Sequence, residues 1–133
     1  MVGLGAGARS YTRSLHWAHP FAVRQAKVRA GVERWVGEDP AFVYNGVRLD
    51  RGEQQRRWVL LSLLEAGLDR ADYRARFGTD VLDDLPELGE AVELGLLTST
   101  LSLTDSGREN ADVLGEWLQS DGVRALRAAW SER

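Results

Sequence analysis

The sequence predicts a mainly α-helical fold with a small β-hairpin, and therefore an α+β protein. Apolar residues recur at helical spacing in several segments that also carry capping residues at their ends. Two shorter stretches, residues 42–49 and 95–103, are rich in β-prone residues and contain turn signals. The length of 133 residues suits one domain, or a small domain with an additional arm.

The first half of the chain is expected to contain an irregular segment, a helix and a tight turn. Residues 1–20 sustain neither a helical nor a strand period, so they are expected to be irregular, and either poorly ordered or ordered only against a partner chain. A helix is expected over residues 21–36, where Pro20 suits its start. Asn45-Gly46 between short β-prone runs then predicts a hairpin turn. We expect one domain to span residues 1–45 and a second to span residues 46–133.

The second domain is expected to begin with two helices. The first covers residues 53–66, and its predicted buried stripe contains Trp58, Leu61 and Leu64. The second is shorter, residues 70–77, because Asp69 can cap its start and Gly78 can end it.

A third helix is expected from a cap at Thr79 or Asp80 to about Leu94. Pro86 lies inside this run, so an alternative start lies near Leu85, after a turn. The residues expected to face the core are Val81, Leu82, Leu85, Leu88 and Val92.

The end of the chain completes the predicted domain. Residues 95–103 are expected to form two short strands joined by a turn, and Thr104 to Gly107 start a helix over residues 108–119. Residues 123–130 could add one or two further helical turns. Three helices followed by a β-hairpin form the winged-helix arrangement, so a winged-helix-like C-terminal domain is expected.

Charge is unevenly distributed along the chain and argues against nucleic-acid binding. The net charge is −3, yet six basic and three acidic residues give residues 1–40 a charge of +3. Between Phe77 and Gly107, which cover the would-be recognition helix and wing, there are seven acidic residues and no Lys or Arg. Phosphate contacts supply most non-specific affinity for DNA, so this surface would repel it. An acidic solvated helix or a protein-docking surface is the expected alternative.

Several classes of site are excluded or disfavoured by composition. The chain contains no cysteine, so it has no disulfide, thiolate nucleophile or Cys-ligated metal centre of its own. Its two histidines, His16 and His19, lack a third ligand at a suitable spacing, and adjacent Asp83 and Asp84 point in different directions on a helix. We therefore expect no catalytic residue and no metal site. No stretch is typical of a signal peptide or membrane span, which favours the cytoplasm and no membrane partner.

The glycine-rich start, Gly3-Leu-Gly-Ala-Gly-Ala-Arg-Ser-Tyr11, is the most informative stretch. Gly3-x-Gly5-x-x-Ala8 superficially matches a dinucleotide fingerprint, but the preceding strand and the following amphipathic helix are both missing. A turn without a ligand is one alternative, and a loop lining a cofactor or substrate cavity is the other. The basic and aromatic residues nearby suit nucleic acid, an anionic ligand or an arm packed on a neighbouring domain; they are Arg9, Tyr11, Arg13, His16, Trp17 and His19.

The order of motifs along the chain resembles a known family. The glycine-rich start resembles the segment late in the barrel of oxygen-independent coproporphyrinogen III oxidase-like radical SAM proteins. The C-terminal domain of that family carries a pattern that this sequence supplies as Tyr73-Arg-Ala-Arg-Phe-Gly78, Leu94-Gly-Leu-Leu97 and Leu103-Thr-Asp-Ser-Gly107. The resemblance covers nearly the whole chain. The segment Arg9-Ser-Tyr-Thr-Arg13 looks closest to a less-studied branch of this family.

The resemblance implies a parent enzyme that binds S-adenosylmethionine and a [4Fe–4S] cluster on a β/α barrel. Residues 1–45 would be the end of that barrel, with Gly3, Gly5, Gly7 and Ala8 as one wall of the S-adenosylmethionine or substrate site. The family binds its cluster through a CxxxCxxC motif, and this chain has no cysteine, so no cofactor is expected within it. The implied partners are the missing N-terminal barrel and a tetrapyrrole substrate. The alternative is a free-standing winged-helix regulatory or protein-interaction module.

Overall fold

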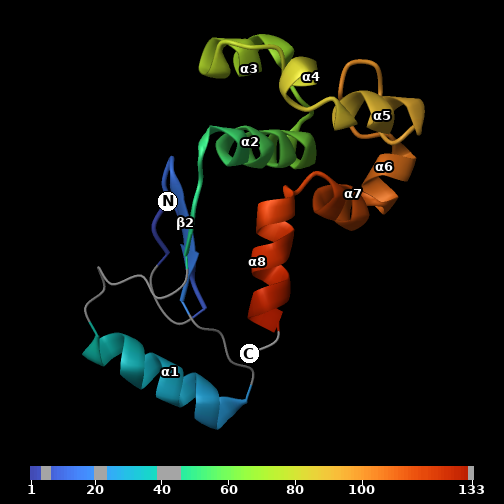
Figure 1. Ribbon diagram of the computed structural model, residues 1–133. Coiled ribbons are helices and arrows are strands. Elements are labelled where there is room, and N and C mark those ends of the chain that lie inside the picture. The colour runs from blue at the N-terminus through green and yellow to red at the C-terminus, as the bar shows by residue number, and fades with distance from the viewer. Residues whose placement is uncertain (4–6, 20–23, 39–45, 132–133) are drawn as a thin grey trace. The chain divides into compact units, whose positions relative to one another are not determined.

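The computed structural model describes residues 1–3, 7–19, 24–38 and 46–131 (Figure 1). The chain divides into two compact units, Met1–Asp50 and Arg51–Arg133. The described residues are mainly helical and include one small antiparallel sheet, so the protein is of the α+β class.

The first unit is built on a three-stranded antiparallel sheet. Strands β1 (Arg9–Tyr11), β2 (Leu15–Ala18) and β3 (Gly46–Arg48) lie in that order, with β2 in the centre. The expectation that residues 1–20 are irregular is therefore wrong. Strands of three and four residues are too short to show a period of two, and their pairing partners, not their own pattern, define them.

The predicted hairpin turn at Asn45-Gly46 is also wrong in the part that the structure describes. Gly46 lies within β3, opposite Trp17 of β2, and not in a turn. Residues 42–45, which form the other half of that predicted hairpin, lie outside the described residues. A glycine opposite a tryptophan leaves room for the indole ring on the same face of the sheet.

Helix α1 (Gln25–Gly37) follows β2 and corresponds to the helix predicted over residues 21–36, whose first residues, 20–23, lie outside the described part. None of its residues is buried, and its apolar residues Val28, Val32 and Val36 are exposed. Among the described residues of this unit, only Ser10 and Leu49 are buried. The unit therefore has a sheet and a helix but lacks a hydrophobic core within its described residues.

The second unit begins with helices α2 (Arg51–Glu65) and α3 (Arg70–Phe77). The prediction for α3 is confirmed at both ends: Asp69 accepts hydrogen bonds from the N–H groups of Ala71 and Asp72, and Gly78 adopts a left-handed conformation with φ of 78°. Short polar side chains at the start and glycine at the end satisfy the free backbone groups of a helix.

The predicted third helix is broken in two, as Pro86 suggested. Helix α4 (Val81–Asp84) is capped by Asp80, and α5 (Glu87–Glu93) starts after Pro86. Proline cannot donate the backbone hydrogen bond that a continuous helix would need at this position. The five residues predicted to face the core do so: Val81, Leu85 and Leu88 are buried, while Leu82 and Val92 pack against the core.

The end of the chain differs from the prediction in its details. Instead of two strands, residues 95–103 contain one isolated bridge between Leu97 and Leu103. The last helix is split into α6 (Asp105–Glu109), capped by Thr104 as predicted, and α7 (Ala111–Trp117). Helix α8 (Asp121–Ser131) confirms and extends the additional turns expected over residues 123–130.

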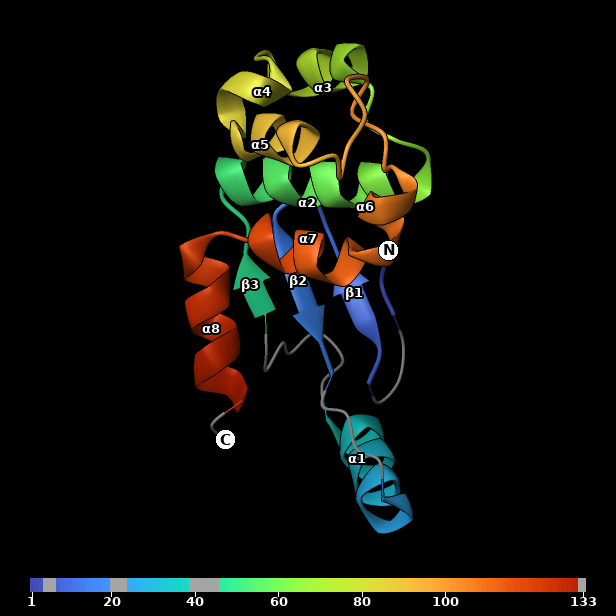
Figure 2. The same cartoon turned by 90° about the vertical axis from the view of Figure 1, so that its right-hand side faces the viewer.

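The hydrophobic core of the second unit lies around α2. In Figures 1 and 2, α3 and α4 lie on one side of α2 and α7 lies on the other. The buried stripe of α2 is Gln55, Val59 and Leu63, whereas Leu61 and Leu64 are 59% and 64% exposed, so the predicted stripe was wrong for these two leucines. The core cluster consists of Val59, Leu63, Leu68, Tyr73, Val81, Leu85, Leu88, Ala91, Leu97, Leu101, Leu114 and Leu118.

Candidate functional site

The glycine-rich start folds back against β1. The N–H of Gly3 donates a hydrogen bond of 2.9 Å to the hydroxyl of Ser10, which is fully buried. A Cβ atom on Gly3 would lie 2.5 Å from the carbonyl oxygen of Arg9, so this position requires glycine. Gly7 has a φ of 76°, which also favours glycine. The N–H of Gly3 is thus occupied within the chain and is not free for a ligand.

Backbone hydrogen bonds hold both sides of this segment. The N–H of Tyr11 donates to the carbonyl oxygen of Met1 at 2.9 Å, and the amino terminus of Met1 donates to the carbonyl oxygen of Tyr11 at 3.0 Å. The N–H of His19 donates to the carbonyl oxygen of Ala8 at 3.0 Å. Of the four residues predicted to line a cofactor site, Gly3, Gly7 and Ala8 therefore lie directly beside β1, and Gly5 lies outside the described residues.

The nearby basic and aromatic residues of the strands lie on two opposite faces of the sheet. Residues opposite one another in an antiparallel pair share a face, so Tyr11, His16 and Val47 lie together, with Arg9 two residues before Tyr11 on the same face. The rings of Tyr11 and His16 are 4.8 Å apart between centroids. Ser10 and Trp17 lie on the opposite face. The face of Arg9, Tyr11 and His16 offers guanidinium, hydroxyl and imidazole groups, which suit an anionic or polar ligand.

The remaining members of the predicted group lie away from that face. His19 contacts Trp35 of α1, with ring centroids 6.4 Å apart in an edge-on arrangement, and Arg13 lies between β1 and β2. The basic and aromatic residues thus separate into three that share one face of the sheet, Arg9, Tyr11 and His16, and others outside that group.

The second unit holds a half-buried carboxylate that receives three hydrogen bonds. Asp84 accepts from Gln55 at 2.6 Å and from the Tyr73 hydroxyl at 2.8 Å, and it also accepts from the hydroxyl of Thr79. Burial, followed by the hydrogen bond to Asp84 and its negative charge, raises the pKa of Tyr73 well above its usual value. Neighbouring Asp83 is exposed, so the two carboxylates do not form a catalytic pair. This network joins α2, α3 and α4.

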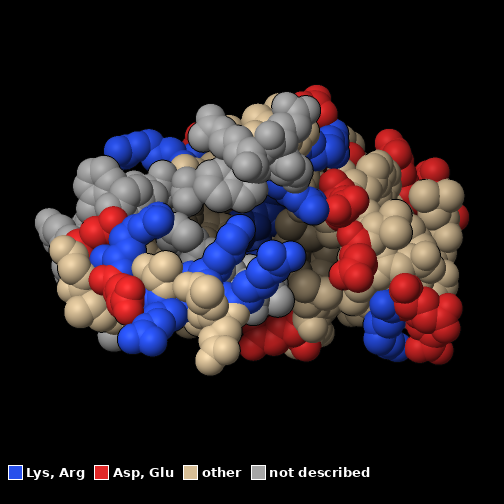
Figure 3. Space-filling view, turned by 90° about the horizontal axis from the view of Figure 1, so that it is seen from below, with Lys and Arg blue, Asp and Glu red and all other residues tan. Residues whose placement is uncertain are grey.

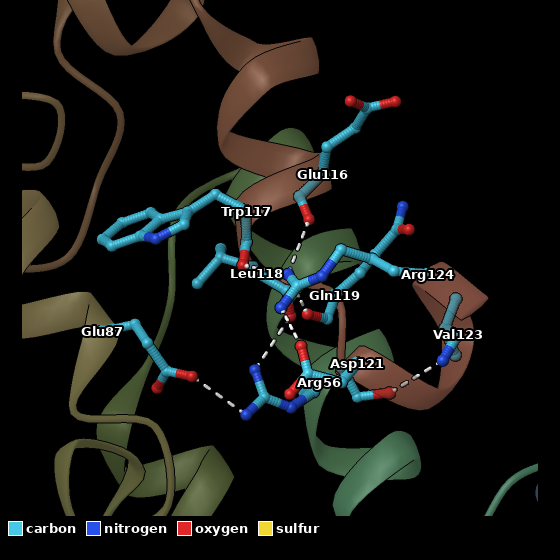
Figure 4. Close-up of polar contacts among 10 residues, drawn as sticks. Arg56, Glu87, Glu116, Trp117, Leu118, Gln119, Asp121, Val123 and Arg124 are labelled. Carbon is cyan, nitrogen blue, oxygen red and sulfur yellow. Dashed lines mark hydrogen bonds and ion pairs between the residues drawn. The ribbon is translucent and has the colours of Figure 1, made fainter. Parts of the chain in front are cut away.

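Arg56 of α2 bridges two other helices, as Figure 4 shows. Its guanidinium donates to the carbonyl oxygen of Leu118 and to the carboxylate of Glu87, both at 2.9 Å. Burial opposes ionisation of Glu87, but its own backbone N–H and Arg56 outweigh that effect, so its pKa lies below the usual value. Arg124 of α8 approaches from the other side and donates to the carbonyl of Gln119 at 2.7 Å. Two arginines thus compensate the negative end of α7.

A further charged cluster fixes α3 to α4. Asp80 accepts hydrogen bonds from Arg70 at 2.8 and 2.9 Å, from Arg74 at 2.5 Å and from the N–H of Leu82 at 3.1 Å. The Arg70 hydrogen bond and then the Leu82 N–H lower the pKa of Asp80. Neither the Asp80 cluster nor the contacts of Arg56 were predicted from the sequence. The arginines and their partners are 6 to 62 residues apart, and no local sequence pattern indicates such contacts.

Within the described ranges no group of three or more acidic or histidine side chains is placed to hold a metal ion. None of the described helices is both long and apolar enough to cross a bilayer. No protein-family model matches the chain, and neither a curated protein nor a solved structure matches it.

Proposed function

We propose that the chain is the C-terminal region of a radical SAM protein similar to oxygen-independent coproporphyrinogen III oxidase, and that it covers the active site without being catalytic alone. One observation carries the proposal: the described part of the first unit has a sheet and an amphipathic helix but no core, whereas the second unit has its own. Ordering a chain costs about 1–2 kcal/mol of conformational entropy per residue, which burial must offset. The first unit therefore needs a further apolar surface, and the end of a barrel would receive one from the rest of that barrel.

The glycine-rich segment supports the same assignment. Close approach at Gly3 and the left-handed conformation of Gly7 bring this segment tightly against β1, where Gly3 bonds to Ser10 on the face opposite Arg9, Tyr11 and His16. In the proposed enzyme, S-adenosylmethionine would meet this wall through Gly3, Gly5, Gly7 and Ala8. The N–H of Gly3 already donates to Ser10, so it is not free to bind a carboxylate. We therefore assign to Arg9 the recognition of carboxylates, either on the cofactor or on a tetrapyrrole substrate.

The cofactors of the proposed enzyme belong mainly to its other part. The chain has no cysteine, so it does not fit a [4Fe–4S] cluster, which the proposed barrel would hold. When bound, the cluster and S-adenosylmethionine would supply the radical chemistry there. The contribution of this chain is limited to closing the site and presenting polar side chains to it.

The second unit would be the winged-helix-like cap. The order α2, α3, the broken helix α4–α5 and then the Leu97–Leu103 bridge supports this assignment, although the bridge is much shorter than a full wing. Helices α5 and α6 and the turn between them carry exposed acidic side chains, among them Glu90, Glu93, Asp105 and Glu109. Figure 3 shows several separate acidic groups among uncharged surface at its right-hand side. This charge favours a protein neighbour over nucleic acid, and a cytoplasmic enzyme is the expected setting.

The test begins with the reading frame that precedes Met1. We expect it to encode a CxxxCxxC motif, and we expect the two polypeptides, when co-expressed, to purify as an assembly that contains iron and sulfide. Arg9→Gln should weaken binding of S-adenosylmethionine or coproporphyrinogen to this assembly by about tenfold, as expected for a lost charge-assisted hydrogen bond. Arg34→Gln, an exposed arginine of α1, is the matched control and should leave binding unchanged. A preceding frame without the motif would contradict the proposal.

The second candidate function is a free-standing winged-helix interaction module. It is favoured by the complete core of the second unit, which does not draw on the first. A DNA titration at low salt separates the DNA-binding form of this candidate from the first proposal. Tight binding whose affinity falls steeply with salt would favour it and would refute the argument from acidic charge.

A further inference from the structure

The helical unit contains a half-open pocket of about 430 Å³ at the C-terminal end of α2. Leu63, Leu64 and Glu65 form one wall, and Ser102, Arg108 and Ala111 form the opposite one. Ligand pockets in proteins usually measure about 300–1,000 Å³, so the space is sufficient for a small group. The floor is apolar, because Leu63 belongs to the core.

Tight contacts fix the two walls relative to each other. A Cβ atom on Gly67 would lie 2.5 Å from the hydroxyl oxygen of Ser102. The segment after α2 therefore lies directly against the loop that connects α5 to α6. The N–H of Leu68 also donates to the carbonyl of Leu101 at 3.1 Å. Leu101 itself is held at a φ of 59°, a left-handed conformation that is rare for a bulky residue. The pocket is therefore largely pre-formed.

The α2 wall is rich in hydrogen-bond acceptors. The last carbonyls of a helix have no partners within it, and they carry partial negative charge. The backbone carbonyl oxygen of Ser62 accepts hydrogen bonds from the N–H groups of Ala66 and Gly67 at 3.1 and 2.9 Å. The carbonyls of Leu63, Leu64 and Glu65 accept no hydrogen bond from any described residue, and the last turn of α2 contains no basic side chain. Glu65, which also lines the pocket, is an acidic residue.

The one basic side chain of the pocket is already engaged. Arg108 donates to the carbonyl of Leu103 at 3.1 Å and to the carboxylate of Asp105 at 2.7 Å. Arg108 is thus paired with Asp105, and Glu65 is the acidic residue that lines the pocket. An anionic ligand would find no uncompensated cation there, whereas a cationic one would find several acceptors.

We propose that this pocket binds an alkylammonium group, presented either by a free alkylamine or by a lysine side chain of a partner polypeptide. An ammonium offers three N–H donors, which match the acceptors at the end of α2 and on Glu65. Its aliphatic stem would lie on Leu63 and Leu64, and Ser102 would close the polar side. The pocket is lined by residues of the second unit alone, so its binding test does not depend on the proposed radical SAM function.

The test is a heteronuclear NMR titration of the full-length chain with n-butylammonium, with N-acetyl-lysine methylamide and with n-butyrate. We expect saturable shifts of the Gly67, Ser102 and Ala111 amides with the two amines and no saturable shifts with butyrate. Tighter binding of the lysine derivative would identify a polypeptide as the source, and tighter binding of butylammonium would identify a free amine. No shifts with either amine, or preferential binding of butyrate, would overturn the proposal.

Two pairs of variants localise the binding. Glu65→Gln should weaken butylammonium binding about 3-fold, which corresponds to one solvent-accessible ion pair, whereas Glu109→Gln, the same charge change outside the pocket, should not. Ala111→Leu should fill the pocket and reduce affinity at least about tenfold, whereas Ala125→Leu on α8 should have no effect. Native amide dispersion in each spectrum checks that the variant is folded. Equal effects within either pair would place the binding elsewhere and overturn the proposal.

Discussion

The hydroxyl of Tyr73 and the carboxylate of Asp84 lie 2.8 Å apart and join the third and fourth helices of the chain. Gln55 of α2 donates to the same carboxylate oxygen, so one atom of Asp84 connects three helices that lie up to 29 residues apart in sequence. Tyr73 is fully buried, and its ring also packs against Trp58 and Phe77. A single carboxylate therefore organises the polar side of the core.

Removal of this carboxylate should be strongly destabilising. Asp84→Ala leaves the donors of Gln55, Tyr73 and Thr79 without an acceptor, and we expect a loss of about 3 kcal/mol in the free energy of unfolding. Tyr73→Phe removes one donor only and should cost about 1–2 kcal/mol. Urea denaturation followed by circular dichroism measures both. Asp83→Ala, an exposed neighbour, should change stability by less than about 0.5 kcal/mol, and a similar loss in both Asp variants would contradict the role of Asp84.

The Arg56–Glu87 pair should show energetic coupling. The two side chains are 23% and 27% exposed, and Glu87 has a second carboxylate oxygen that is buried without a partner among the described residues. Arg56→Ala leaves the charge of Glu87 uncompensated, so a loss of about 2 kcal/mol is expected. Because Glu87→Gln removes that charge, the double variant should be less destabilised than the sum of the single ones. Additive losses in this double-mutant cycle would show that the pair does not interact.

Substitution by alanine should have opposite effects on stability at two glycines that both lie in helices. At Gly107 of α6, a Cβ atom would lie 2.0 Å from the carbonyl oxygen of Leu96, so the backbone must shift; Gly107→Ala should cost about 2 kcal/mol or more. At Gly115 of α7, nothing lies within 4 Å of that position. Gly115→Ala should therefore stabilise the protein by about 0.5–1 kcal/mol through helix propensity. Thermal unfolding of the two variants distinguishes these outcomes, and destabilisation by both would refute the packing argument.

Acid should weaken the contact between α3 and α4. The pKa of Asp80 is lower in the folded state than in the unfolded chain, so its ionised form stabilises the folded state above the unfolded pKa of about 4. This contribution disappears as the pH falls through the folded pKa. Asp80→Asn keeps the cap of α4 but loses the charge. The difference in unfolding free energy between the wild type and this variant should be largest near neutral pH and shrink below about pH 4, whereas a difference independent of pH would contradict it.

The second unit should fold without the first. Its core cluster lies entirely between Val59 and Leu118, and residues 51–133 form one compact unit. A polypeptide of residues 51–133 should keep its helical circular dichroism and a cooperative unfolding transition. The complementary polypeptide, residues 1–50, should not unfold cooperatively when isolated. Loss of structure in residues 51–133 would show that the first unit contributes to the core.

Local signals in the sequence predicted the parts of the fold that depend on local physics. Asp69 and Gly78 set the two ends of α3, Thr104 caps α6, and Pro86 separates α4 from α5, because each acts on backbone groups within a few residues. The ends of these helices therefore followed from the sequence.

Features that depend on distant partners could not be predicted in this way. Helix α2 carries apolar residues on several sides, and the stripe that is buried includes Gln55, whose burial depends on a carboxylate 29 residues away. The short strands β1 and β2 are defined by their pairing, and the face shared by Arg9, Tyr11 and His16 appears only once that register is known. Arg56 gave no signal for the same reason, since its carbonyl partner is 62 residues away.

The described residues of the first unit form no hydrophobic core, so under the proposed function its folding should depend on the concentration of the surface that it packs against. A segment that gains its apolar contacts from another surface is ordered in proportion to how much of that surface is present and how tightly it binds. Its ordered fraction should then rise with the concentration of that surface, as for a ligand-binding equilibrium. If the proposed function holds, the stability of Met1–Asp50 is a property of the assembly, and mutations on the opposing surface should affect it as much as mutations within it.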